Sequence, residues 1–177
     1  MWNRKTARIF LWMAFAFYHL FLLGVLFLGR GGRFQGDSFW EYAKYSVNLI
    51  PFRTIWGYVR DYMEQGGQIL ALAFRNIAGN FVLFFPMGIF LPCLFPKTEK
   101  FHKTALISIC TIFGVELLQL LLRRGIFDVD DLILNISGWL LGFAVLKNPF
   151  INKILKKIYL LPQPEDIALH GGEKKEA

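Results

Sequence analysis

Four apolar runs, each close to the length needed to cross a lipid bilayer, constrain the fold of this 177-residue chain more than any other feature. A transmembrane helix needs about 20 mostly apolar residues. The predicted spans cover about 9–28, 70–95, 104–122 and 130–146. The fourth span is short in its purely apolar part, so its ends must tilt or lie within protein. The sequence therefore predicts an all-α fold, a polytopic membrane bundle of four transmembrane helices.

The composition of the chain is typical of a small membrane protein. Hydrophobic residues make up 55% of the sequence and aromatic residues 17%. The formal net charge of +7 would raise nucleic acid as a partner in a soluble protein. Here the lysines lie beside the apolar runs, where membrane topology and anionic lipid head groups explain them. No basic helix or stacking platform is free of the membrane segments, so we expect membrane lipids and no nucleic acid as partners.

The two cysteines give no indication of redox or metal chemistry. Cys93 and Cys110 both lie inside apolar runs, which is typical of small packing residues. The sequence contains no CxxC motif and no cluster of Cys and His with metal-ligand spacing. We therefore expect no metal site and no cofactor.

The basic residues predict the orientation of the spans. Lysine and arginine are enriched in the segments that remain in the cytoplasm. If the N-terminus is inside, the cytoplasmic ends of the spans carry Arg4, Lys5, Arg8, Lys97, Lys100, Lys103, Lys147, Lys153, Lys156 and Lys157. The loops on the opposite side hold one lysine, Lys44, but six arginines, so the bias is moderate. Because the number of spans is even, we expect both termini to be cytoplasmic.

The segment 30–68, between the first and second spans, is too long for a tight connection and too aromatic for a disordered one. It contains nine Phe, Trp and Tyr residues, and Trp and Tyr favour the head-group layer of the bilayer. Two triplets recur at helical spacing: Trp40, Lys44 and Val47, and Ile55, Val59 and Tyr62. The segment therefore predicts two short interfacial helices, broken at 48–51, which ends in Pro51.

The chain forms one predicted transmembrane domain over 1–160, followed by a polar tail over 161–177. The tail contains Pro162, Pro164 and the Gly171-Gly172 pair, and few apolar residues. Such a segment cannot bury enough apolar surface to fold, so we expect a disordered cytoplasmic tail.

Polar side chains follow helical spacing near the outer ends of three spans. Asn76 and Asn80 share a face of the second span, and Glu116 and Gln119 share a face of the third, which Arg123 continues outwards. One face of the fourth span carries Asp128, Asp131, Asn135, Gly138 and Gly142. The two glycines suit close contact between helices. The polar faces predict a cluster in the outer half of the bundle, roofed by the aromatic segment.

The residues of this cluster can act in function or can hold helices together. Buried amides often connect membrane helices, for ~0.6–2 kcal/mol each, and for Asn80 and Asn135 the two interpretations are equally supported. For Glu116 and Asp131 function is favoured, because amides would connect helices at a lower desolvation cost. We expect Glu116 to be protonated, hydrogen-bonded or paired, with Arg123 or Arg124 as its charge partner.

Two further aspartates lie at the start of the fourth span. Asp128 and Asp130 can be N-terminal charges that the helix dipole stabilises, and for Asp130 this is the preferred interpretation.

The ordered set of motifs resembles the VanZ-like family. The motifs are Asn48-x-x-Pro51-Phe52, Asn76-x-x-x-Asn80 with Phe85-Pro86-x-Gly88, Glu116-x-x-Gln119, and Asp128-x-x-Asp131-x-x-x-Asn135-x-x-Gly138. Either arginine of Arg123-Arg124-Gly125 can match the one that the family usually has before its aspartates. The resemblance implies a small multi-pass protein of the bacterial cytoplasmic membrane. The family's namesake is associated with low-level resistance to teicoplanin, a glycopeptide with a lipid tail.

The favoured hypothesis is a binding protein. An outer polar cavity would hold a lipid head group, or the lipid tail of a lipoglycopeptide antibiotic, and would lower teicoplanin susceptibility. A lipid-linked cell-wall precursor is a further candidate partner, and homo-oligomerisation stays open. The predicted ligand-binding residues are Asn48, Pro51, Phe52, Asn76, Asn80, Glu116, Gln119, Arg123, Arg124, Asp128, Asp131 and Asn135.

The alternative hypothesis is an intramembrane enzyme that modifies an envelope lipid or a polyprenyl-linked precursor. Glu116 and Asp131 would be the catalytic residues, as general acid and base or as ligands of a divalent metal that holds a phosphate. The cluster has no histidine, no Ser or Cys nucleophile beside a base, and no Gly-rich phosphate loop. The sequence therefore favours binding over catalysis.

Overall fold

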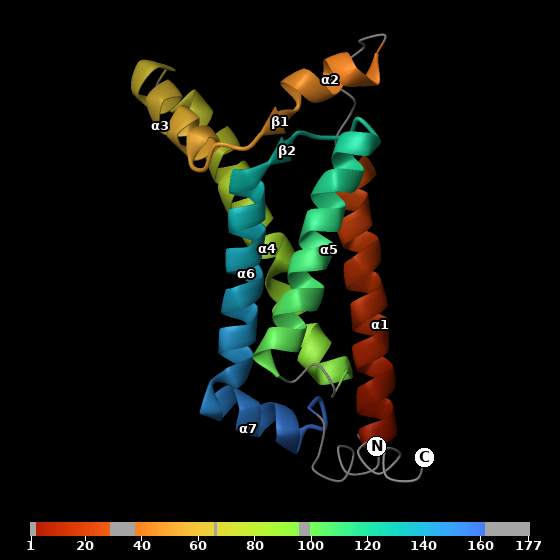
Figure 1. Cartoon of the computed structure of the whole chain (residues 1–177). Helices are drawn as coiled ribbons and strands as arrows, with labels where there is room; N and C mark the ends of the chain where they lie inside the picture. The colour runs from red at the N-terminus through yellow and green to blue at the C-terminus, as the bar shows by residue number, and fades with distance from the viewer. Residues whose placement is uncertain (1–2, 29–37, 66, 96–99, 162–177) are drawn as a thin grey trace.

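A computed structural model describes residues 3–28, 38–65, 67–95 and 100–161 of the chain. The long helices run side by side, and two short ones lie across one end of them (Figure 1). In chain order the elements are α1 (Arg4–Leu23), the π-helix η1 (Gly24–Leu28), α2 (Phe39–Tyr45), β1 (Val47–Asn48), α3 (Arg53–Gln65), α4 (Gln68–Leu94), α5 (Phe101–Leu121), β2 (Phe127–Asp128), α6 (Val129–Lys147) and α7 (Pro149–Lys157).

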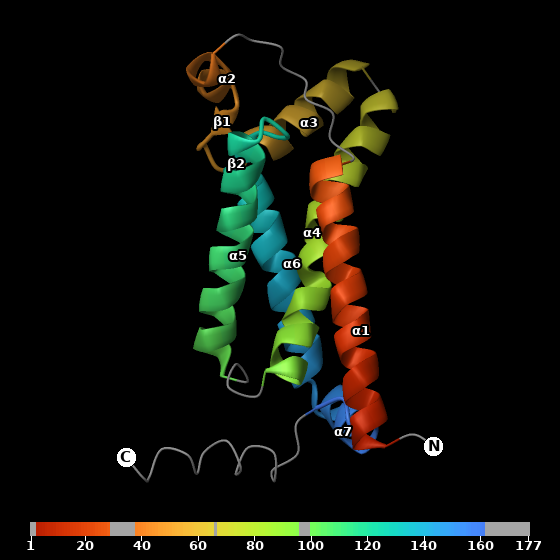
Figure 2. The same cartoon turned by 90° about the vertical axis from the view of Figure 1, so that its right-hand side faces the viewer.

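Four of these helices are long and apolar enough to cross a membrane, which confirms the prediction of four spans. They cover Arg4–Leu28, Ile69–Leu94, Phe101–Leu121 and Val129–Lys147. Figures 1 and 2 show them as one bundle, with α2 and α3 at one end and α7 at the other. These ends are called the α3 end and the α7 end below.

Helices α4 and α6 lie in direct backbone contact. A Cβ atom added to Gly138 would lie 1.8 Å from the carbonyl oxygen of Phe81, and one added to Gly142 would lie 2.0 Å from that of Phe85. From the other side, a Cβ atom on Gly88 would lie 2.2 Å from the carbonyl oxygen of Trp139. The close helix contact expected of the two glycines in the fourth span is therefore confirmed. Gly138 lies against Phe81 and Gly142 against Phe85, so later residues of α6 contact later residues of α4 and the two helices are parallel.

Helix α1 packs against this pair through apolar side chains and one buried hydroxyl. Tyr18 and Leu22 join Phe84 in the main core. The Tyr18 hydroxyl donates a hydrogen bond to the carbonyl of Leu83, over 2.8 Å. Pro86 has no backbone N–H, so α4 lacks one of its own hydrogen bonds close to this point. The bond gives the hydroxyl a partner inside an apolar core, where an unpaired one would be costly.

The segment between the first and second spans forms short helices, as predicted, with the break between them where expected. Helix α2 ends at Tyr45, however, so Val47 is not part of it. Val47 lies in β1, which pairs in parallel with β2 so that Val47 faces Phe127 and Asn48 faces Asp128. Helical spacing alone could not indicate this pairing, because the partner strand is far away in the sequence.

Helix α7 was not anticipated from the sequence. Asn148 caps it by accepting hydrogen bonds from the backbone N–H groups of Phe150 and Ile151, and Pro149 occupies the first turn. An Asn-Pro pair followed by apolar residues at helical spacing is a helix-start signal. The predicted disordered tail lies outside the described residues, apart from Leu161.

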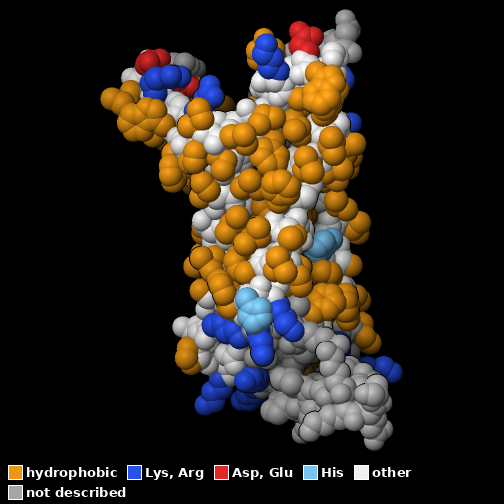
Figure 3. Space-filling view, in the orientation of Figure 1, with side chains coloured by type: hydrophobic (Ala, Val, Ile, Leu, Met, Phe, Trp, Pro, Cys, Tyr) orange, Lys and Arg blue, Asp and Glu red, His pale blue; other side chains and the backbone are white. Residues whose placement is uncertain are grey.

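The two ends of the bundle differ in charge. Figure 3 shows a broad hydrophobic surface between them; among the described residues, Lys and Arg gather at the α7 end and both signs occur at the α3 end. The described basic residues in the helix ends at the α7 end include Arg4, Lys103, Lys147, Lys153 and Lys157. Helix α1 begins at this end and α6 finishes there (Figure 1).

The α4–α6 contact predicts that Gly142→Ala destabilises the protein. The added methyl group would overlap the Phe85 carbonyl, and overpacking of this kind costs about 1–3 kcal/mol. We expect a lower midpoint of thermal unfolding in detergent, followed by intrinsic tryptophan fluorescence. Gly114→Ala in α5 is the control, because nothing lies within 4 Å of its added Cβ atom. Equal midpoints for the two variants would contradict the proposed role of the contact.

Candidate functional site

Two aspartates at the start of α6 hold the α3 end of the molecule together. Asp128 is the N-cap of α6 and accepts a hydrogen bond from the backbone N–H of Asp130 over 2.9 Å. The same carboxylate accepts from the side-chain amide of Asn48 over 3.0 Å and from the hydroxyl of Thr54. Since Asn48 ends β1 and Thr54 belongs to the first turn of α3, the carboxylate joins three elements.

Asp130 serves the neighbouring helix. Its carboxylate accepts hydrogen bonds from the backbone N–H groups of Phe52, Thr54 and Ile55, the last two over 2.8 and 3.1 Å. These groups lie at the start of α3, where backbone N–H groups have no partner within the helix. The preferred interpretation of Asp130 as a charge for its own helix dipole is therefore incomplete. Asp130, only 1% exposed, provides α3 with the cap that α3 lacks.

This network, the aspartate clamp of Asn48, Thr54, Asp128 and Asp130, explains part of the sequence motif. Asn48 and Asp128, two predicted ligand-binding residues, contact each other inside it. Pro51 and Phe52, also predicted to bind ligand, form the exposed turn that leads into α3. Thr54 and Asp130 were not predicted as site residues. The one available signal was negative: α3 begins after Pro-Phe, and neither residue can cap a helix with its side chain.

A second group of polar residues lies deeper, between the spans. The side-chain amide of Asn135 in α6 donates a hydrogen bond to the Glu116 carboxylate in α5 over 3.3 Å. Both residues are almost fully buried, with 1% and 2% exposed. Asn80 of α4 is also buried, and Asn76, one turn nearer the α3 end, is half-buried. The structure therefore turns the predicted polar faces of the three helices inwards.

This interior group, the polar cluster of Asn80, Glu116 and Asn135, has hydrogen-bonding capacity that the protein does not use. Among the described residues, the side-chain nitrogen of Asn80 and the side-chain oxygen of Asn135 have no hydrogen-bond partner. The same is true of the indole nitrogen of Trp139, one turn further along α6. Trp139 was missed as a site residue, although it lies four residues after Asn135. A buried polar group without a partner costs about 1–3 kcal/mol, so these atoms are candidates for ligand contacts.

Gln119 is held by a different contact. Its side-chain nitrogen donates a hydrogen bond to the carbonyl of Leu26 over 3.0 Å. Leu26 belongs to the π-helical end of the first span, where carbonyl groups are displaced from the regular α-helical pattern. Gln119 therefore joins α5 to the first span through its nitrogen, while its buried side-chain oxygen has no partner among the described residues.

The remaining predicted residues are Asp131, Arg123 and Arg124. Asp131 is buried on α6, one turn closer to the α3 end than Asn135. Arg123 and Arg124 form the turn after α5, where Arg123 adopts a positive φ of 54° and the Arg124 backbone N–H bonds the Gln119 carbonyl. The ion pair expected between Glu116 and one of these arginines stays a prediction. In the described part of the chain, no group of three or more His, Cys, Asp and Glu could hold a metal ion.

The fold and its buried polar residues define the class of the molecule: a small multi-pass membrane protein with four candidate spans and a helical cap at one end. Residues 15–153 match the VanZ/LLP1 family, so the chain belongs to that family. The chain is also similar to Protein VanZ of Enterococcus faecium, with 25% identity over 118 residues that cover 66% of this chain. It spans 63% of the length of that relative. No solved structure matches the chain.

The aspartate clamp predicts that Asp130→Ala releases the start of α3. Three backbone N–H groups would lose their acceptor, and loss of a capping side chain costs about 0.5–2 kcal/mol. We expect faster hydrogen–deuterium exchange over 52–56, measured by mass spectrometry, with little change in α5. Asp61→Ala removes a partly exposed acidic side chain of α3 itself and is the matched control. Unchanged exchange over 52–56 in Asp130→Ala would show that the clamp does not hold the helix.

Proposed function

We propose that this protein binds an amphiphile of the outer leaflet, either a lipid head group or the lipid tail of a lipoglycopeptide, at the polar cluster. The observation that carries the proposal is the unused hydrogen-bonding capacity of the buried residues Asn80 and Asn135, of which Asn135 also contacts the Glu116 carboxylate. In hydrocarbon, polar atoms of this kind need a partner. A bound polar head or amide would supply it without any bond being broken.

The position of the cluster supports access from one leaflet. Glu116 lies five residues before the end of α5, and Asn135 six residues after the start of α6. At a rise of about 1.5 Å per residue, both lie roughly 8–9 Å below the α3 end. Trp40 and Trp56 are exposed at that end, and Trp is favoured in the head-group layer. A lipid could therefore bring its polar part close to the cluster while its chains remain in the bilayer.

We further propose that the α7 end is cytoplasmic, so that both termini lie inside and the α3 end faces outwards. Among the described residues, Lys and Arg gather at the α7 end (Figure 3), which supports this orientation through the positive-inside rule. The membrane would then be the bacterial cytoplasmic membrane, and the α3 end would meet extracellular lipoglycopeptides directly.

The proposal predicts that the protein lowers teicoplanin susceptibility through the polar cluster. In a susceptible Gram-positive host, wild type should protect against teicoplanin and leave vancomycin, which has no lipid tail, unchanged. Glu116→Gln and Asn135→Ala should reduce the protection by about two- to tenfold, because a hydrogen bond contributes ~0.5–1.5 kcal/mol. The measurement is the minimal inhibitory concentration at matched amounts of protein in the membrane.

A control for this experiment lies on the same helix as Glu116. Thr111→Ala removes a hydroxyl that bonds only the Ile107 carbonyl of its own helix, so it should protect as well as wild type. Equal protection by wild type and both cluster variants would exclude a role for the cluster. Protection against both drugs would point away from recognition of a lipid tail.

The enzyme alternative rests on two buried carboxylates, Glu116 and Asp131, on adjacent helices. Two experiments distinguish catalysis from binding. Asp131→Glu keeps the charge and should retain part of a binding activity. If Asp131 is a general acid or base, the same variant displaces the reacting carboxylate and the catalytic rate should be lost. A modified lipid released by the purified wild-type protein, and absent with Asp131→Asn, would establish catalysis in place of binding.

A further inference from the structure

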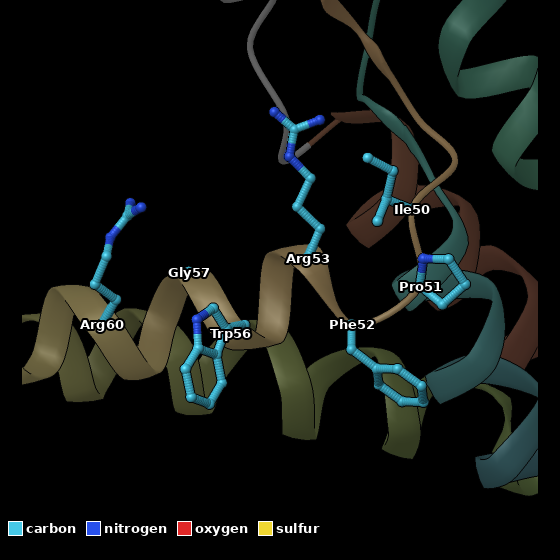
Figure 4. A pocket seen from close by; sticks show the side chains of 7 residues that line it. All are labelled: Ile50, Pro51, Phe52, Arg53, Trp56, Gly57 and Arg60. Atoms are coloured by element: carbon cyan, nitrogen blue, oxygen red, sulfur yellow. The ribbon is translucent and has the colours of Figure 1, made fainter.

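The N-terminal half of α3 forms a second polar site, separate from the polar cluster. A depression of about 660 Å³ lies along it. Its lining comprises Ile50, Pro51, Phe52, Arg53, Trp56, Gly57 and Arg60. Figure 4 shows Arg53 and Arg60 rising from one side of the helix, on either side of Gly57, while Trp56 and Phe52 point to the other side.

The spacing of the two arginines allows them to hold one anion. They are seven residues apart, so their Cα atoms are separated by about 10 Å along the helix and lie on the same face. Gly57 lies between them, and nothing lies within 4 Å of a Cβ atom added to it. The helix surface between the guanidinium groups is therefore bare. Long arginine side chains can lean together over such a gap and bind the oxygens of a phosphate.

Both guanidinium groups are available for a ligand. Among the described residues, Arg53 forms no ion pair with an acidic side chain. Arg60 contacts Asp61 over 3.1 Å, but its side chain is 65% exposed, and exposed pairs of this kind contribute little. The next acidic residue of the helix, Glu64, lies one turn beyond Arg60. The Asp128 and Asp130 carboxylates at the start of α3 accept hydrogen bonds from Thr54 and from backbone N–H groups, and in the described part of the chain no ion pair joins them to Arg53 or Arg60.

The other side of the helix provides the apolar part of the site. Trp56 is 69% exposed and Phe52 is 60% exposed. The cap formed by Asp128 and Asp130 holds the start of α3 at the edge of the bundle, as the views in Figures 1 and 2 agree. A helix with arginines on one side and large aromatic residues on the other lies in the head-group layer with its aromatic side towards the acyl chains.

We propose that Arg53, Gly57 and Arg60 bind the phosphate of an anionic phospholipid head group, with Trp56 and Phe52 packed against its glycerol and upper acyl chain. The occupant is a membrane lipid because one depression combines two arginines with exposed Trp56 and Phe52 side chains, which matches an amphiphile and not a free anion. The site is distinct from the polar cluster: it needs neither Glu116 nor Asn135. It would place a lipid at the edge of the bundle, beside the route to the cluster.

The test uses the full-length protein in dodecyl maltoside micelles with dioleoylphosphatidylglycerol as the probe, and native mass spectrometry as the readout. The double variant Arg53→Gln/Arg60→Gln should bind the lipid about tenfold more weakly or worse, because two charge-assisted contacts are removed. Lys44→Gln, which removes a positive charge from α2 at the same end, should change the affinity by less than about twofold.

A second variant separates binding from folding. Gly57→Leu keeps both arginines and fills the depression between them. Because leucine favours helix more than glycine does by about 0.8–1 kcal/mol, α3 should be no less stable, whereas lipid affinity should fall about fivefold or more as the guanidinium groups are kept apart. The thermal midpoint is measured alongside the affinity.

Four results would overturn the proposal. The first and second are wild-type binding of phosphatidylglycerol by the double variant or by Gly57→Leu. The third is a loss of binding in Lys44→Gln as large as in the double variant. The fourth is competition by inorganic phosphate at concentrations equal to those of the lipid. The last result would identify a site for free phosphate. Thr111→Ala in α5, whose hydroxyl bonds the Ile107 carbonyl of its own helix, should keep wild-type lipid affinity in this assay. The arginine and Gly57 variants leave Glu116 and Asn135 unchanged, so a loss of binding in them is not a loss at the polar cluster.

Discussion

Backbone contact between α4 and α6 is the constraint on which the rest of the structure depends. Inside a bilayer, apolar side chains gain little by exchanging acyl chains for another helix, so small residues that bring backbones together favour association. Gly88, Gly138 and Gly142 leave no room for a Cβ atom at this interface. The contact fixes the rotation of both helices about their axes, and this rotation turns Asn80 and Asn135 towards the interior.

Helix α6 also links the interior of the bundle to its cap. Asp128 and Asp130, at its start, bind β1 and α3, and Asn135 lies about two turns further along the same helix. A rigid helix therefore sets the distance between the polar cluster and the start of α3. A shift of α6 along α4 would move both groups together. The glycine contact is therefore coupled to the geometry at the α3 end.

The spans and the break between the interfacial helices could be predicted because hydropathy and helical spacing are local properties of a sequence. The inward faces of α4, α5 and α6 followed from the same spacing. The cap of α3 could not, since Asp130 lies 76 residues after Thr54 and spacing cannot tell which helix a carboxylate serves. The pairing of β1 with β2 could not be predicted for the same reason, because the two strands are far apart in the sequence. Helix α7 differs: its signal, Asn148 before Pro149, was present in the sequence.

The buried polar residues of the spans differ in how completely the protein uses them. The Gln119 side chain donates to a carbonyl of the first span, and Tyr18 donates to Leu83, so each joins two helices. Asn80 and Asn135 each keep an atom without a protein partner. An apolar side chain at either position would avoid the cost of that atom, and a connecting amide would use it. Gln119 also keeps a side-chain oxygen without a partner among the described residues, and Asn135 also joins α6 to α5. The unpartnered atoms of the three amides are the ones that a ligand would satisfy under the proposed function.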